Sequence, residues 1–249
     1  MLDGDSISLV LDALRPERAA LVQLLDCLGS DQWALPTECP TYSVKGIATH
    51  VLGDDLSLLS RQRDEAENGL LQVAAELPGA DFRTLLDTFN DRWVAAARFL
   101  STDLVIELLR LTGEWTAAYY GRVDPTAPGE PVGFFGASGH SSPFWQAMAR
   151  EYVERWVHHS QIRRAVGLPS LAGEPFLHVG VEVAAAAAGV EPSVPAEPDG
   201  LWALGPVTLG DAQQAADILT RAHARDEIRA LASGPAEAVD LLATFAGRP

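Results

Sequence analysis

The feature that most constrains the fold is a helical spacing of apolar residues through the first two thirds of the chain. In residues 6–28, apolar side chains recur three, four or seven places apart at Ile7, Leu11, Leu14 and Leu21. This is the repeat of an amphipathic helix. Residues 81–100 and 102–121 predict two more long helices. A chain of 249 residues built from such helices can bury a large core.

Two further helices have recognisable starts. Thr41 or Ser43 supplies an N-cap for a helix with a broad apolar face that includes Ile47. Ser142 followed by proline predicts the start of another helix, because serine caps well and proline loses no needed N–H in the first turn. That helix is expected to run to about Val166, where a Gly-Leu-Pro sequence ends it.

The composition changes in the last third of the chain. An Ala-rich segment, a Pro-rich linker, a short strand pair and two helices are expected at 176–189, 191–200, 201–209, 211–231 and 235–246. The predicted fold class is therefore mainly α: a helical bundle over residues 1–170, followed by a small C-terminal α/β module over 171–249. Residues 122–142 are rich in Gly, Pro and Ser and predict a long loop, a candidate lid or wall of a site.

Charge and composition exclude several classes of function. The net charge is −16, from 34 acidic and 18 basic residues, and a chain this acidic repels nucleic-acid phosphates. No apolar run reaches the roughly 18 to 20 residues that cross a bilayer. The N-terminus lacks the pattern of a secretory signal, so we expect a cytoplasmic protein. Cys27 and Cys39 form no disulfide framework or CxxC motif and are expected to be free thiols.

The spacing of Glu154 and His158 is the first sign of a chemical site. The two residues are four apart on a predicted helix, so both side chains project from one face. A carboxylate and an imidazole so placed can bind one divalent ion, and helical bundles often build metal sites in this way. Glu151, one turn earlier, is a substitute candidate. Taken alone, the pair is more often an exposed pair than a metal site.

A catalytic zinc-type site needs a third ligand from elsewhere and one open position. His50 is the natural donor, because it lies mid-helix beside Ile47 and Val51, where an unsatisfied imidazole is costly. A single buried histidine is usually hydrogen-bonded in a core. Something must therefore link His50 to the pair on the later helix.

Two stretches of the sequence supply that link by resemblance. Residues 33–50 read WALPTECPTYSVKGIATH, and residues 149–167 read AREYVERWVHHSQIRRAVG. The first resembles the N-terminal signature of the mycothiol-dependent maleylpyruvate isomerase family, W..PT.CPGWSV.D...H. The second is similar to that family's E.W.H motif with its R.A.G ending. The resemblance covers roughly residues 6–167.

The resemblance implies a DinB-like four-helix bundle that holds a divalent metal, often zinc. Carried over by position, the metal ligands are His50, Glu154 and His158. The resemblance also implies mycothiol as a low-molecular-weight thiol cosubstrate and a small molecule as substrate. His159 is next to a ligand but faces about 100° away on the helix, so we do not count it as one.

This sequence departs from the family pattern at two positions. Tyr42 stands where a Trp is frequent, and Gln161 stands where many members carry Asp. If that Asp orients a ligand or binds the thiol, Gln161 alters the site and leaves the substrate open.

Three hypotheses of function follow. The first is a metal-dependent isomerase or S-transferase in which the metal activates a thiol as thiolate. The second is a thiol-independent hydrolase or tailoring enzyme on the same bundle. The third is a non-catalytic ligand-binding protein. No motif favours a particular arginine as the receiver of a substrate carboxylate, and the ordinary interpretation of each is a solvated helix charge; the candidates are Arg155, Arg163, Arg225 and Arg229.

Overall fold

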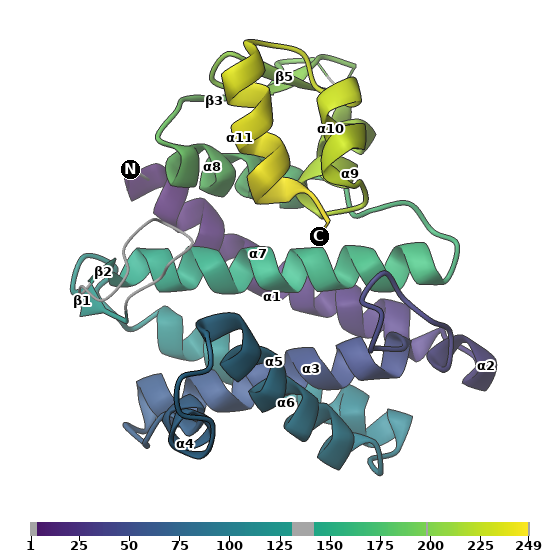
Figure 1. Ribbon diagram of the computed structural model, residues 1–249, viewed down its shortest axis with the longest axis vertical. Coiled ribbons are helices and arrows are strands. Elements are labelled where there is room, and N and C mark those ends of the chain that lie inside the picture. The colour runs from purple at the N-terminus through teal and green to yellow at the C-terminus, as the bar shows by residue number, and fades with distance from the viewer. Residues whose placement is uncertain (1–3, 131–141, 198, 249) are drawn as a thin grey trace. The chain divides into compact units, whose positions relative to one another are not determined.

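The computed structural model describes residues 4–130, 142–197 and 199–248. Within these ranges the chain is mainly α-helical, with short antiparallel strands that lie mostly toward its C-terminus (Figure 1). The predicted fold class, a mainly α chain followed by a small α/β module, is confirmed. The elements in chain order are α1 (Gly4–Asp26), α2 (Ser30–Trp33), α3 (Val44–Leu58), the π-helix η1 (Leu59–Arg63), α4 (Gly69–Glu76), α5 (Phe82–Ala97), α6 (Thr102–Tyr120), β1 (Pro128–Gly129), β2 (Ser142–Pro143), α7 (Phe144–Ala165), α8 (Phe176–Ala188), β3 (Pro192–Ser193), β4 (Trp202–Leu204), β5 (Val207–Gly210), α9 (Ala212–Leu219), α10 (Arg225–Leu231) and α11 (Ala236–Ala246).

The chain divides into two compact units. One consists of residues 18–122, and the other, which we call the split unit, joins residues 1–17 to residues 123–249. Helix α1 begins in the split unit and ends in the 18–122 unit. This division does not coincide with the predicted boundary at residue 170, which stays a prediction about independently folding domains.

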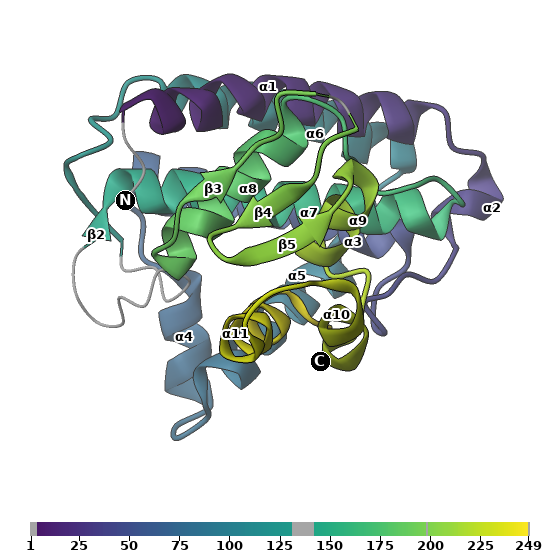
Figure 2. The same cartoon turned by 90° about the horizontal axis from the view of Figure 1, so that it is seen from above.

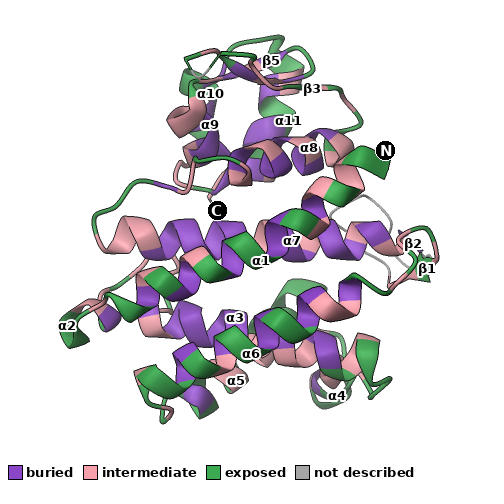
Figure 3. Cartoon of the chain, turned by 180° about the vertical axis from the view of Figure 1, so that it is seen from behind, coloured by how far each residue is buried: buried purple, intermediate pink, exposed green. Residues whose placement is uncertain are grey.

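Helix α3 is central to the 18–122 unit, where it contacts α5 and α6 while α4 packs against α5. The core between α3 and α6 contains Ile47, Leu52, Leu58, Val105 and Leu109, all 0% exposed. Burying an aliphatic side chain of this size stabilises a fold by about 1.5–3 kcal/mol. Figure 3 shows α3 buried along most of its length. The position and rotation of α3 are therefore fixed by packing, and with them its polar residues.

A buried ion pair crosses the same core. Two guanidinium nitrogens of Arg18 donate to the carboxylate of Asp55, at 2.5 and 3.2 Å. Arg18 also donates to the carbonyl oxygen of Leu109 at 2.8 Å, and the Thr112 hydroxyl donates to Asp55 at 2.5 Å. The shared bonds satisfy charges that would be costly to bury alone.

In the split unit, two large aromatic side chains of α7 make polar contacts with α8 and with the segment that precedes it. The Tyr152 hydroxyl donates to the carbonyl oxygen of Phe176 at 2.7 Å, and Trp156 Nε1 donates to that of Leu171 at 2.8 Å. A Cβ added at Gly180 of α8 would lie 2.4 Å from the Trp156 ring, so glycine permits the close approach.

The C-terminal module is a three-stranded antiparallel sheet in the order β3-β4-β5, with α8 and α9 packed on it (Figure 2). Gly205 turns the β4–β5 hairpin with a φ of 52°, a left-handed conformation that favours glycine. The module is tied to the end of α7, since Arg164 donates to the Ser170 hydroxyl at 2.6 Å and Ser170 donates to Asp217 of α9 at 2.5 Å.

Two details of the predicted helices were wrong. Ser142 belongs to strand β2 and does not cap α7. The backbone N–H groups of Phe144 and Trp145 instead donate to the carbonyl oxygens of Ala127 and Pro125, both at 2.9 Å. The preceding segment thus takes the place of a side-chain cap.

The predicted helix over 211–231 is two helices, α9 and α10. Arg221 adopts a left-handed φ of 62°, which ends the first helix. The carboxylate of Glu227 accepts a hydrogen bond from the backbone N–H of Ala224 at 2.6 Å, which starts the second.

Other expectations were met or lie outside the described residues. Ser43, one of the two proposed caps, accepts a hydrogen bond from the Gly46 N–H at 3.2 Å at the start of α3. Neither Cys27 nor Cys39 forms a disulfide. Most of the predicted loop over 122–142 lies outside the described residues. None of the helices in the described ranges has both the length and the apolar character needed to cross a membrane.

Candidate functional site

Helix α3 places His50 at its centre. The side chain of His50 is 9% exposed, and its Nε2 atom lies 3.4 Å from Oδ2 of Asp54, one turn later on the same helix. The apolar neighbours on α3 fix the helix, so the ring direction is set by packing as well as by this contact. His50 therefore directs Nε2 along the polar side of α3.

The ring of Tyr42 lies beside His50, with the two ring centroids 5.8 Å apart. Its hydroxyl donates to Asp91 of α5 at 2.8 Å. Burial, and then the hydrogen bond and negative charge of Asp91, raise the pKa of Tyr42 well above its usual value, so the phenol is neutral over the physiological range. Tyr42, where the family pattern has Trp, therefore keeps an aromatic wall next to His50.

Helix α7 brings Glu154 and His158 together as their spacing predicts. Nε2 of His158 lies 3.7 Å from Oε2 of Glu154. The pair repeats the arrangement on α3, where His50 and Asp54 also sit four residues apart with Nε2 facing the carboxylate.

Gln161 sets the direction of the His158 ring. Its side-chain oxygen Oε1 lies 2.9 Å from Nδ1 of His158. An amide oxygen only accepts, so Nδ1 carries the proton in this hydrogen bond, and Nε2 of a neutral ring is left with its lone pair. Metal-binding histidines are typically held this way by a carbonyl or carboxylate on the other ring nitrogen. Gln161 therefore can perform the orienting role that its departure from Asp put in doubt.

His159 faces another direction. Its Nδ1 atom lies 3.0 Å from Oε1 of Glu17, and both side chains are fully buried. Among the described residues, neither Oε2 of Glu17 nor Nε2 of His159 has a hydrogen-bond partner. This contact follows from the helical rotation that separates His159 from the face of His158.

The other candidates have local structural partners. Glu151 is buried and accepts a hydrogen bond from Arg150. Arg163 donates to the carbonyl oxygen of Pro169 at 2.7 Å, and burial lowers the pKa of its guanidinium. Arg229 forms ion pairs with Asp226 and Asp240, each at 2.6 Å.

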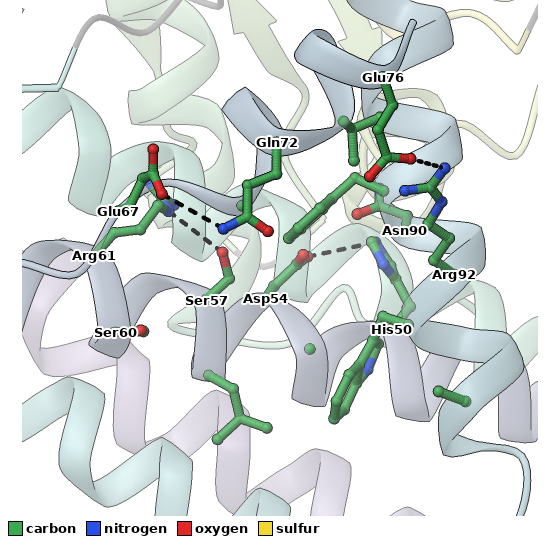
Figure 4. Close-up of a pocket in the computed structure, with 17 residues that line it drawn as sticks. His50, Asp54, Ser57, Ser60, Arg61, Glu67, Gln72, Glu76, Asn90 and Arg92 are labelled. Carbon is green, nitrogen blue, oxygen red and sulfur yellow. Dashed lines mark hydrogen bonds and ion pairs between the residues drawn. The ribbon is translucent and has the colours of Figure 1, made fainter.

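A pocket of about 540 Å³ opens beside His50, entirely within the 18–122 unit. It is walled by α3, η1, α4 and α5 (Figure 4). The π-helix η1 extends α3 with a wider turn and contributes Ser60 and Arg61, while α5 contributes Phe89, Asn90 and Trp93. Widened turns of this kind often occur at functional sites. The pocket therefore gives a ligand access to the polar side of α3.

Neither this pocket nor Asp54, which lines it next to His50, was predicted from the sequence. The sequence did contain a signal for Asp54, because Asp54 stands four residues after His50. This is the same interval that singled out Glu154 and His158. The α4 and η1 segments had no comparable signal in the apolar pattern.

The structure brings Glu154 and His158 together on α7 and describes His50 on α3 of the other unit. Within either unit taken alone, the described residues gather no cluster of three or more His, Cys, Asp or Glu side chains suited to a metal ion. The three-ligand site stays a prediction.

Comparison with known families identifies the region that carries all three residues. The model of the family described as "Mycothiol maleylpyruvate isomerase N-terminal domain" matches residues 14–163, more than half of the chain. Searches of curated proteins and of solved structures gave no match. The matched region contains the whole first motif and the second motif up to Arg163, together with part of α1, all of α2 to α6 and most of α7. The chain therefore belongs to the mycothiol maleylpyruvate isomerase N-terminal domain family.

Proposed function

We propose that this protein is a metal-dependent and thiol-dependent isomerase or S-transferase that acts on a small electrophile. In this proposal His50, Glu154 and His158 bind a divalent metal, zinc foremost, and mycothiol is the thiol. The observation that carries the proposal is the hydrogen bond between Gln161 and His158, in a chain whose family match spans all three proposed ligands.

The chemistry of the donor set fits such a metal. Two imidazoles and one carboxylate form the usual protein ligands of a catalytic zinc ion, which keeps one position open. Gln161 holds the proton of His158 on Nδ1, so Nε2 offers its lone pair on the side of Glu154. A metal bound there would act as a Lewis acid and lower the pKa of a thiol at neutral pH.

The proposed reaction begins with addition of the cosubstrate's thiolate to an activated carbon–carbon double bond. A C–S bond forms, the resulting single bond rotates, and the C–S bond then breaks as the double bond re-forms, which gives isomerisation and returns the thiolate. With a substrate that carries a leaving group or a strained ring, the thiolate instead attacks the carbon that bears the leaving atom. The bond to that atom breaks, the atom departs with the bonding electron pair and takes a proton from solvent, and the new C–S bond remains as an S-conjugate. In this reaction Gln161 orients the ring of His158, and the pocket beside His50 is open to a ligand.

Metal content tests the ligand set. The protein is purified without chelator and analysed for metals beside the His158→Ala variant, with His223→Ala as a matched control on a different segment. We expect about one divalent metal per chain in the parent and the control, and loss of that metal in His158→Ala. A parent free of metal, or a His158→Ala variant that retains it, contradicts the ligand set.

Turnover separates the thiol-dependent hypothesis from its alternatives. The parent is incubated with maleylpyruvate, with and without mycothiol, and the products are followed by absorbance and mass spectrometry. Isomerisation or S-conjugation that requires the thiol supports the proposal. Turnover of substrates without thiol points to a hydrolase or tailoring enzyme, and binding without turnover points to a non-catalytic protein.

A further inference from the structure

A second cavity lies within the split unit. It has a volume of about 180 Å³ and is lined by α8, the β4–β5 hairpin and α11, which Figure 1 shows together toward the C-terminal end of the chain. His50, Glu154 and His158 are not among the described residues that line it. The cavity is therefore a site separate from the proposed metal ligands.

Every described side chain that lines this cavity is apolar. The walls are formed chiefly by Ala184 and Ala187 of α8, Leu204 and Val207 of the hairpin, and Leu242 and Phe245 of α11. A water molecule in a protein cavity needs about two to four polar partners. These side chains offer no hydrogen bond, so the cavity suits an apolar molecule better than it suits water.

The walls run from the core of the unit to its surface. Ala184, Leu204 and Leu242 are buried, whereas the side chain of Leu241, which also lines the cavity, is 60% exposed. Ala188, another lining residue, is exposed as well. A ligand can therefore enter from solvent beside Leu241 and Ala188 and reach buried walls.

The volume limits the size of the ligand. An engineered cavity of about 150 Å³ with Leu, Ile and Phe walls binds benzene. Pockets that hold drug-sized ligands measure about 300–1,000 Å³. A cavity of about 180 Å³ therefore matches one aromatic ring with a small substituent and is too small to enclose a long lipid chain.

The charge around the cavity opposes anions. Glu191, Glu237 and Asp240 each stand next to a lining residue in the sequence, and they are the only charged residues that do so among those described. Asp240 pairs with Arg229 at 2.6 Å. Burying a ligand's carboxylate among apolar walls is costly, and nearby carboxylates add repulsion. The ligand that fits is therefore uncharged.

We propose that this cavity binds a small uncharged aromatic molecule of one ring, through contacts with the alanines of α8 and with Leu242 and Phe245 of α11. The ligand fills apolar space that the side chains leave open, so it stabilises the folded chain. Neither a metal nor a thiol takes part, so this inference goes beyond the proposed function and does not depend on it.

Binding of toluene to the purified full chain tests the proposal. Benzoate is the charged comparison, because it has the same ring with a carboxylate, and myristate is the long-chain comparison. Saturation-transfer NMR measures binding, and thermal unfolding measures stabilisation. We expect toluene to bind saturably at one site and to raise the Tm, and benzoate to bind at least about 10-fold more weakly.

A larger side chain on α8 tests the location. Ala187→Leu should fill the cavity and weaken toluene binding at least about 10-fold, while circular dichroism shows an unchanged helix content. The matched control is Ala186→Leu, the same substitution one residue earlier on α8, because Ala186 is not among the described lining residues. It should leave toluene binding unchanged. Ala188→Leu, at an exposed position, gives a second filling variant if Ala187→Leu folds poorly.

Several results would overturn the proposal. They are an absence of toluene binding, toluene binding that neither filling variant weakens, equal weakening by Ala186→Leu, and benzoate binding as tight as that of toluene. Myristate that binds more tightly than toluene would assign the cavity to a long lipid. A dimer in sedimentation that Leu241→Ser dissociates would assign it to a second copy of the chain.

Discussion

Oε1 of Gln161 lies 2.9 Å from Nδ1 of His158, one turn back along α7, and this contact fixes which ring nitrogen faces Glu154. The family pattern has a carboxylate at the position of Gln161, and an amide oxygen can accept the same proton without adding a charge. The substitution changes the charge around His158 but retains a hydrogen-bond acceptor for its ring.

If His158 binds the proposed metal, Gln161→Leu should weaken that binding because it removes the acceptor for the His158 ring proton. Outer partners of metal-binding histidines typically contribute about 10- to 100-fold in affinity. We expect a loss of this size, measured by competition with a chelator of known affinity. Gln161→Glu restores an acceptor of the same length and should bind metal about as well as the parent. Equal losses in both variants would show that Gln161 acts through packing alone.

The apolar pattern predicted most of the long helices, because a buried stripe must recur with the helical period. Leu21 and Ile47 are fully buried where the pattern placed them. The same pattern missed η1 and α4, since these short segments contribute only Leu59 and Val73 to the buried set. It also joined α9 to α10, because apolar spacing does not register a single left-handed residue such as Arg221.

The candidate site was predictable only within one helix. A four-residue interval determines that Glu154 and His158 share a face, whatever the rest of the chain does. Contacts between elements carry no such local signal: Arg18 meets Asp55 across 37 residues, and Tyr42 meets Asp91 across 49. The pocket likewise depends on how α4 and α5 pack near α3, which the sequence pattern does not specify.

Asp55→Ala should destabilise the protein strongly. It leaves the buried guanidinium of Arg18 without its bidentate partner, a change that typically costs about 3–5 kcal/mol. Urea denaturation followed by circular dichroism measures the free energy of unfolding. Arg110→Ala is the matched control, because its ion pair with Asp26 is exposed and such pairs contribute only about 0–1 kcal/mol. Similar losses of unfolding free energy in Asp55→Ala and Arg110→Ala would contradict the conclusion that burial makes the Arg18–Asp55 ion pair the more important of the two.

Tyr42 should make the stability sensitive to alkaline pH. Burial and the contact with Asp91 raise its pKa in the folded state above the ordinary value of 10.0. On raising the pH, the unfolded chain therefore loses the proton first. The stabilisation is fully present below pH 10.0 and is lost as the pH rises through the folded-state pKa.

The check compares the parent with Tyr42→Phe, which cannot titrate at this position. The parent's advantage in free energy of unfolding should stay constant up to about pH 9 and shrink between about pH 10 and about pH 12. An advantage that stays constant over this range would mean that the Tyr42 hydroxyl titrates alike in the folded and unfolded states.

Gly53→Ala should distort the pocket beside His50. Its new Cβ would lie 2.3 Å from Trp93, and Trp93 cannot simply swing away, because its Nε1 donates to the carbonyl oxygen of Thr49 at 2.6 Å. Alanine raises helix propensity by about 1 kcal/mol over glycine, whereas overpacking costs about 1–3 kcal/mol, so the net effect should be destabilising.

The double variant Gly53→Ala with Trp93→Leu separates the clash from other effects of the substitution. Removing the large ring relieves the overlap, so the double variant should lose less stability than the two single losses added together. Gly173→Ala is the control, because a Cβ there meets nothing within 4 Å. Thermal and urea unfolding measure the stability of the parent and of the four variants, and additive losses would show that Gly53 and Trp93 do not press on one another.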